Sequence, residues 1–155
     1  MQRIKIDSID RKILRLLQKD ASLTAAAIGE QIGLSQSPCW RRIQRLKDSG
    51  LIKQQGMIFD RRKLGFDTMV FAHVKLTAHG RSKVAEFGDT IRKFPEVMEC
   101  HLLLGQVDFL LRIVTPELEA YERFFFERLS QLPDVQEVTS SIALTEVKQT
   151  TELPI

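Results

Sequence analysis

LTAAAIGEQIGLSQSPCWRRIQRLKDSGLI, residues 23–52, has the capping residues of two short helices joined by a tight turn. Thr24 can cap the first helix, and Gly33 suits the left-handed conformation that ends a helix. Ser35 can cap the second helix, and Gly50 closes it. This spacing predicts a helical pair whose second member starts directly after the turn.

A third helix is expected before this pair. Asp7 and Asp10 have the spacing of a capping box, and apolar residues recur at helical intervals from Ile9 to Leu17. Three helices with a tight turn between the second and the third are typical of a helix-turn-helix DNA-binding domain.

The third helix has an inward and an outward side. At 100° per residue, Cys39, Ile43 and Leu46 share the inward stripe. The outward side is rich in arginine, which reads guanine and binds phosphates. A solvated basic face is the alternative interpretation of the arginines alone. The predicted DNA contacts are Ser35, Gln36, Ser37, Arg41, Arg42, Gln44 and Arg45.

Charge is divided unevenly along the chain. Residues 1–65 contain 14 Lys and Arg against 6 Asp and Glu, a net charge of +8, and the remainder contains 9 against 14, a net charge of −5. A basic half beside an acidic half favours a polyanionic partner for the first half only. Uneven surface charge within one domain is the alternative.

Domain boundaries follow from a change of pattern after the helices. Residues 52–59 alternate with period two, which predicts a short linker strand or ribbon. Arg61, Arg62 and Lys63 then form a polar, Gly-terminated segment that either touches phosphates or is simply solvated. We therefore expect a helix-turn-helix domain over residues 1–60, a linker over 61–66 and a second domain over 67–155.

The second domain is predicted to be a ferredoxin-like βαββαβ unit, which makes the chain an α+β protein. Thr115 and Pro116 are expected to be the N-cap and first residue of its second helix. The expected strands are 68–77, 97–104, 108–115 and 135 to about 148, and the expected helices are 84–94 and 115–132.

These strands carry apolar residues on both faces. Val70 and Val74 oppose Met69 and Phe71, for example. Two helices can cover only one face of a four-stranded sheet, so the other face requires a partner, most simply a second copy. A homodimer would present two recognition helices to a pseudo-palindromic double-stranded DNA site.

The order of four segments resembles the Lrp/AsnC family of leucine-responsive, or feast/famine, regulators. The segments are IDSIDRKILRLLQKDA, IGLSQSPCWRRIQRLKDSGLI, ECHLLLGQVDFLLRI and TSSIALTEVKQTTELPI, and together they extend over essentially the whole chain. The resemblance implies a winged or simple helix-turn-helix, an ACT-like domain for effector binding and oligomerisation, and dimers that assemble further to a tetramer or octamer.

The resemblance also implies an effector, usually an amino acid, bound near the turn between the second and third strands. Turn N–H groups can receive a carboxylate, and Asp108 can receive an ammonium group. Many relatives have an acidic residue where this chain has Gln106. The implied effector residues are His101, Gly105, Gln106, Val107, Asp108, Thr139 and Ser141.

Three other functions are compatible with a small domain protein of this composition, and the sequence bears on each of them. An enzyme is disfavoured because no histidine lies in a nucleophile, acid/base or P-loop motif. A metal or thiol sensor is disfavoured because Cys100 and His101 are strand neighbours and point to opposite faces, and because Cys39 is expected to face the core of the first domain. An effector-independent DNA-organising protein remains the alternative, and its binding would be sequence-independent.

No cofactor, catalytic residue or metal site is expected. The sequence has neither a signal-peptide core nor an apolar run of membrane-spanning length. We therefore expect a cytoplasmic protein associated with the nucleoid and not with a membrane. Cys39 and Cys100 are expected to be buried, reduced thiols.

Overall fold

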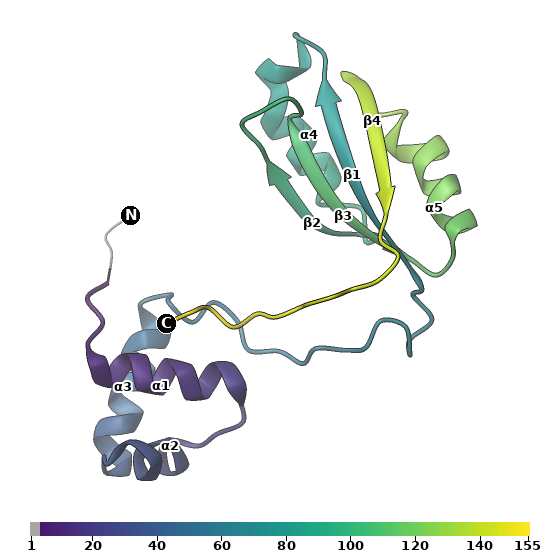
Figure 1. Ribbon diagram of the computed structural model, residues 1–155. Coiled ribbons are helices and arrows are strands. Elements are labelled where there is room, and N and C mark those ends of the chain that lie inside the picture. Colours follow the sequence, from purple (N-terminus) through teal and green to yellow (C-terminus); the bar gives the residue numbers. More distant parts are fainter. Residues whose placement is uncertain (1–3) are drawn as a thin grey trace. The chain divides into compact units, whose positions relative to one another are not determined.

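A computed structural model describes residues 4–155, which form two compact units (Figure 1). The first unit comprises residues 4–58 and 148–155, and the second comprises 59–147. The tail 148–155, expected in the second domain, belongs to the first unit because it packs there. Ile155 lies against the helical core. The Gln18 side chain receives a hydrogen bond from the Leu153 N–H, at 2.8 Å, and donates one to its carbonyl, at 3.2 Å.

The first unit is the expected three-helix arrangement. Asp7 and Asp10 form a capping box, with distances of 2.8 and 3.0 Å between each side-chain oxygen and the other residue's backbone nitrogen. Thr24 caps the second helix, and Gly33 ends it at a φ of +74°. Ser35 is the N-cap of the third helix, but its side chain makes no capping hydrogen bond. The helices are α1 (Ser8–Lys19), α2 (Ala25–Ile32) and α3 (Gln36–Asp48).

The turn between α2 and α3 depends on a close backbone approach. A Cβ atom on Gly29 would lie 2.5 Å from the carbonyl oxygen of Leu34, so no larger residue fits without a shift. The Leu34 N–H also donates to the Gly29 carbonyl at 2.8 Å. Glycine here allows the turn to fold tightly onto α2, which fixes where α3 starts.

The linker strand predicted over residues 52–59 is not formed. Between α3 and Asp67 the described chain has no strand, and Met57, Ile58 and Phe59 are exposed. A strand requires hydrogen bonds to a neighbouring strand, and no strand among residues 4–155 pairs with this segment. Alternation alone therefore predicted a ribbon that this single chain does not contain.

The second unit is a four-stranded antiparallel sheet with the order β2-β3-β1-β4, as in the ferredoxin-like fold predicted. Its strands are β1 (Thr68–Leu76), β2 (Val97–Leu102), β3 (Phe109–Thr115) and β4 (Val135–Ile142). Its helices are the 3₁₀ turn η1 (Gly80–Lys83), α4 (Val84–Ile91), α5 (Leu118–Phe124) and the π-helical continuation η2 (Phe125–Leu129).

Two details of this unit differ from expectation. The N-cap of α5 is Glu117 and not Thr115, because the Thr115 hydroxyl donates instead to the Glu117 carbonyl at 2.9 Å. Cys100 is exposed, whereas Cys39 is buried as predicted. Cys100 lies on β2, an edge strand whose residues are mostly exposed.

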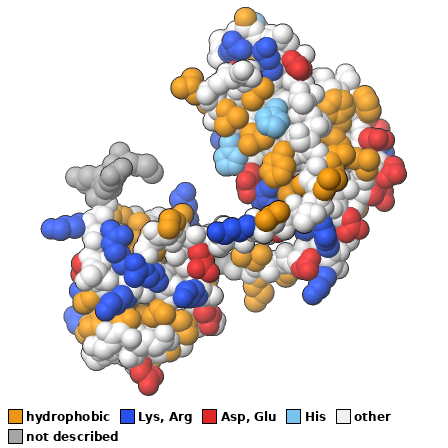
Figure 2. Space-filling view, in the orientation of Figure 1, with side chains coloured by type: hydrophobic (Ala, Val, Ile, Leu, Met, Phe, Trp, Pro, Cys, Tyr) orange, Lys and Arg blue, Asp and Glu red, His pale blue; other side chains and the backbone are white. Residues whose placement is uncertain are grey.

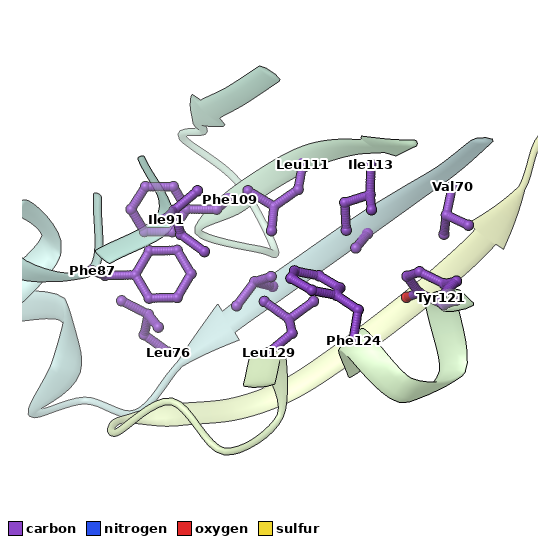
Figure 3. Packing of buried hydrophobic residues seen from close by; sticks show 12 residues of the cluster. Val70, Leu76, Phe87, Ile91, Phe109, Leu111, Ile113, Tyr121, Phe124 and Leu129 are labelled. Carbon is purple, nitrogen blue, oxygen red and sulfur yellow. The ribbon is translucent and has the colours of Figure 1, made fainter. Parts of the chain in front are cut away.

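One face of the sheet is covered by the helices (Figure 3). Phe87 of α4 contacts Phe109 of β3, with ring centroids 4.5 Å apart. Phe124 of α5 and Leu129 of η2 reach the same core. The residues of β1 that face this core, Val70, Ala72, Val74 and Leu76, are almost completely buried. Helices of both βα units therefore lie on one side of the sheet, as the sequence predicted, and the other face carries no helix.

Candidate functional site

The third helix has the two sides that its sequence predicts. Cys39 and Leu46 are fully buried and Ile43 nearly so. Ser37 and Arg41 are exposed on the opposite side, and Gln44 is half-buried. Within residues 4–155, Arg41 enters no ion pair. Its guanidinium is therefore available to an external anion.

The N-terminal end of α3 adds polar groups to this side. Ser35 and Gln36 are exposed there, directly after the turn. The unpaired backbone N–H groups of a helix start favour anions such as phosphate. On the side visible in Figure 2, Lys and Arg side chains gather on the first unit, and acidic side chains gather along the helical side of the second.

Arg42 and Arg45 have a different environment from Arg41. Arg42 Nη1 lies 2.7 Å from Asp7 Oδ2 and 2.9 Å from Asp10 Oδ1. Arg45 Nη2 lies 2.5 Å from Asp10 Oδ2. Arg42 and Arg45 are thus tied to the two carboxylates at the start of α1. Arg42 is the more enclosed of them, with a side chain 29% exposed against 52% for Arg45.

These contacts shift the protonation equilibria of Asp7 and Arg42. The Asp10 backbone N–H, followed by the Arg42 guanidinium, lowers the pKa of Asp7 below its ordinary value. Hydrogen bonds to Asp7 and Asp10 raise the pKa of Arg42 further. Both changes favour the charged forms, so Asp7 and Arg42 form an ion pair at neutral pH.

The predicted effector residues fall into two groups. His101, Thr139 and Ser141 lie on the helix-free face of the sheet, whereas Gly105, Gln106 and Val107 belong to the turn that joins β2 to β3. Gly105 and Gln106 are exposed and Val107 is half-buried.

The sheet register separates the residues on the helix-free face. His101 pairs with Leu110, Leu110 with His73 and His73 with Thr139, so the row runs from one edge strand to the other. At about 4.8 Å between strands, three steps place His101 roughly 14 Å from Thr139 along the backbone. These residues share a face but do not converge on one pocket within a single chain.

Asp108 is held by its own chain. Its Oδ2 accepts a hydrogen bond from the Leu76 N–H at 2.7 Å, and its Oδ1 lies 3.2 Å from Arg81 Nε. The Asp108 N–H also donates to the Val74 carbonyl at 2.9 Å. The carboxylate therefore joins the end of β1 to the start of β3 and is only 16% exposed. Sequence reasoning missed Arg81, because no local pattern connects it to Asp108.

His101 has its own ionic neighbours. Its Nε2 lies 3.3 Å from Glu99 Oε2, and Arg112 Nη2 lies 2.6 Å from Glu99 Oε1. The hydrogen bond from Arg112, aided by that to His101, lowers the pKa of Glu99 against the opposing effect of burial. His73, on the central strand of the same face, was not among the predicted residues. Figure 2 shows histidine side chains set among hydrophobic ones on this unit.

Other kinds of site find no support in the described chain. Among residues 4–155, no three His, Cys, Asp or Glu side chains are arranged to hold a metal ion. In the same part of the chain, no helix is long and apolar enough to cross a membrane.

Comparison with protein-family models matches both units. Residues 6–53 match the model of a winged helix-turn-helix DNA-binding domain, and residues 69–153 match that of the Lrp/AsnC ligand binding domain.

Comparison with single proteins gives relatives of nearly the same length. The transcriptional regulator AzlB of Bacillus subtilis is 38% identical over 98% of this chain and 97% of its own. The DNA-binding transcriptional activator DecR of Escherichia coli is 33% identical over 97% and 99%. Among solved structures, the regulator NMB0573 of Neisseria meningitidis in complex with L-Met superposes with a TM-score of 0.91, at 33% identity and 97% coverage of both chains.

Proposed function

The chain belongs to the Lrp/AsnC family of DNA-binding transcriptional regulators, and from this premise we propose how its two units divide the work. The first unit reads DNA with the outward side of α3. The second unit pairs with a second copy and binds an amino acid. The exposed, unpaired Arg41 on a recognition helix is the single observation that carries this proposal.

DNA contact by α3 agrees with its charge and exposure. In this proposal Arg41 and Ser37 reach base edges in the major groove, with Gln44 beside them. Ser35 and Gln36 contact phosphates through the helix start. Arg42 and Arg45 belong to the interface as well. Because their guanidinium groups are already paired with Asp7 and Asp10, they attract phosphates less strongly than unpaired arginines would.

Arg41→Ala is expected to weaken binding to an operator by roughly 1–3 kcal/mol, because a bidentate contact to a base is lost. The operator is obtained by selecting sequences from random DNA with the wild-type protein, and affinities are measured by gel shift. Lys47→Ala serves as the control, since it removes a cation of the same helix outside the proposed contact face. Equal losses for the two variants would contradict the assignment of Arg41 to base recognition.

A homodimer is proposed from the helix-free face of the sheet. Phe71 and Leu110 lie on this face without a helix to cover them and are only half-buried. Uncovered apolar side chains in the middle of a sheet face are typical of a protein interface, and a second copy of the sheet has the matching surface. From membership of the Lrp/AsnC family we also propose that the dimers assemble further to a tetramer or octamer.

An amino acid is the proposed effector. Its site is proposed at the β2–β3 turn, formed by Gly105, Gln106, Val107 and Asp108, with His101, Thr139 and Ser141 supplied across subunit contacts. The separation of His101 from Thr139 within one chain supports a site completed by a neighbouring subunit. L-Met bound to the relative NMB0573 supports the chemical class.

Asp108→Asn is expected to abolish the response to the effector and to leave the dimer intact, because Asn cannot balance an ammonium charge. Arg81→Gln is the matched control, since it breaks the same ion pair but leaves the carboxylate. Calorimetric titration with the effector measures both variants. If Arg81→Gln abolishes effector binding as completely as Asp108→Asn, the role of Asp108 is to stabilise the fold and not to bind the effector.

The effector itself is found by a thermal-shift screen of the twenty amino acids, followed by DNA binding with each that raises Tm. A hit that changes operator affinity supports the proposal. An effector-independent DNA-organising protein would show no hit and would bind selected and random DNA equally. We place the protein in the cytoplasm on the nucleoid, because DNA is its partner.

A further inference from the structure

A buried carboxylate lies behind the DNA-facing helix. Asp10 is the third residue of α1, and its relative exposure is 0%. Aspartate is almost never fully buried unless it is paired. Here its oxygens accept from the Asp7 N–H at 3.0 Å, from Arg42 Nη1 at 2.9 Å and from Arg45 Nη2 at 2.5 Å. Asp10 is therefore the point where α1 and α3 are joined by charge.

The charges of the cluster are balanced. Asp7 and Asp10 contribute two negative charges, and Arg42 and Arg45 contribute two positive ones. Arg42 Nη1 donates to both carboxylates: it lies 2.7 Å from Asp7 Oδ2 and also donates to Asp10 Oδ1. The capping box holds the two carboxylates relative to each other. Two side chains of α3 thus adopt positions that are set by the start of α1.

Arg45 is the member of the cluster that can reach outward. Its side chain is half exposed, and Nη2 alone is used by Asp10. Its Nε and Nη1 groups donate to no described residue among 4–155, so they remain available to DNA. An arginine on a surface helix normally samples many rotamers, and ordering it costs free energy when it binds. Asp10 removes much of that cost by fixing the guanidinium before DNA arrives.

We propose that Asp10 is a positioning residue of the DNA interface, which orients Arg45 for recognition without touching DNA itself. This inference rests on the proposed DNA contact of α3. In this proposal the preference for operator over other DNA depends partly on Asp10 of α1, which lies outside the helix-turn-helix pair α2 and α3.

The Asp10→Asn variant distinguishes a positioning role from a purely electrostatic one, because the two roles predict changes in DNA affinity of opposite direction. Removing a negative charge from the first unit makes it more attractive to phosphates, so binding to random DNA should stay constant or become tighter. Positioning predicts the reverse for the operator, because Asn keeps only one acceptor oxygen and turns the other into an NH2 group, so Arg42 and Arg45 can no longer both donate to residue 10. Opposite changes on the two DNAs therefore identify a positioning role.

The experiment uses the full chain and two labelled DNA fragments, one selected from a random pool by the wild-type protein and one of scrambled sequence. We expect Asp10→Asn to lower the ratio of the two affinities about tenfold. Asp20→Asn is the matched control, because it removes the same charge from the other end of α1, where, within residues 4–155, the Asp20 side chain accepts hydrogen bonds only from Ser22. The control is expected to keep the wild-type ratio.

The affinity ratios of the two variants support or overturn the positioning role of Asp10. An unchanged ratio in Asp10→Asn, including equal losses on both fragments from weakened folding, overturns the proposal and leaves Asp10 a purely structural residue. If the wild-type protein itself does not prefer the selected fragment, the proposed function fails instead. A lower ratio with the Asp20→Asn ratio unchanged supports positioning.

A double-mutant cycle tests whether Asp10 acts through Arg45. Arg45→Gln keeps the buried carboxylate and its contact with Arg42, so the unit should fold. We expect Arg45→Gln to lower the affinity ratio and Asp10→Asn to add little to it in that background. Fully multiplicative losses would show that the two side chains act independently and would overturn the proposed role.

Discussion

Leu110→Lys is expected to convert the dimer into a monomer and to lower operator affinity by roughly 100-fold, because a monomer loses the second recognition helix. Leu110 lies at the centre of the helix-free face, between His101 and His73 in the sheet register. A lysine there can extend into water in the monomer, whereas in the dimer its charge would be buried without a partner. Sedimentation measures the assembly, and gel shift measures the affinity.

Leu118→Lys is the matched control for this experiment. Leu118 lies on α5, in the helical layer on the other side of the sheet, and is 40% exposed. The same chemical change at this position is expected to leave both assembly and operator affinity unaltered. If Leu110→Lys remains dimeric and Leu118→Lys does not, the helical layer and not the open sheet face forms the dimer.

Leu46→Ala is expected to destabilise the first unit by about 2–5 kcal/mol and to abolish DNA binding. Leu46 is fully buried on α3 and contributes to the small core shared by α1, α2 and α3. A unit of this size buries too little surface to tolerate such a cavity. Thermal unfolding followed by circular dichroism should show an early helical transition.

The second unit should not respond to this change. Its own core contains none of the first unit's residues, so the sheet and the dimer are expected to persist in Leu46→Ala. Leu51→Ala is the control within the first unit, because Leu51 is 41% exposed. A single cooperative transition that shifts as a whole would contradict independent folding of the two units.

Local chemistry explains which features could be predicted from the sequence. Capping boxes, left-handed glycines and helical periodicity act within about four residues, so Asp7, Thr24 and Gly33 marked the helices of the first unit correctly. The βαββαβ order followed from alternating and helical stretches in the same way. Local patterns also misled. The alternation over residues 52–59 has no partner strand among residues 4–155, and Thr115 is not the N-cap of α5, because its hydroxyl donates to the carbonyl of Glu117, which is the N-cap.

For the candidate site, the sequence by itself determined which side chains are present and on which face of α3 or of the sheet they lie. Only the tertiary structure decided what they contact. Asp10 meets Arg45 across 35 positions of chain, and Asp108 meets the Leu76 N–H across 32. His101 and Thr139 are separated by the strand order. Such pairings depend on how distant segments pack, because no pattern of neighbouring residues encodes the distance between two elements.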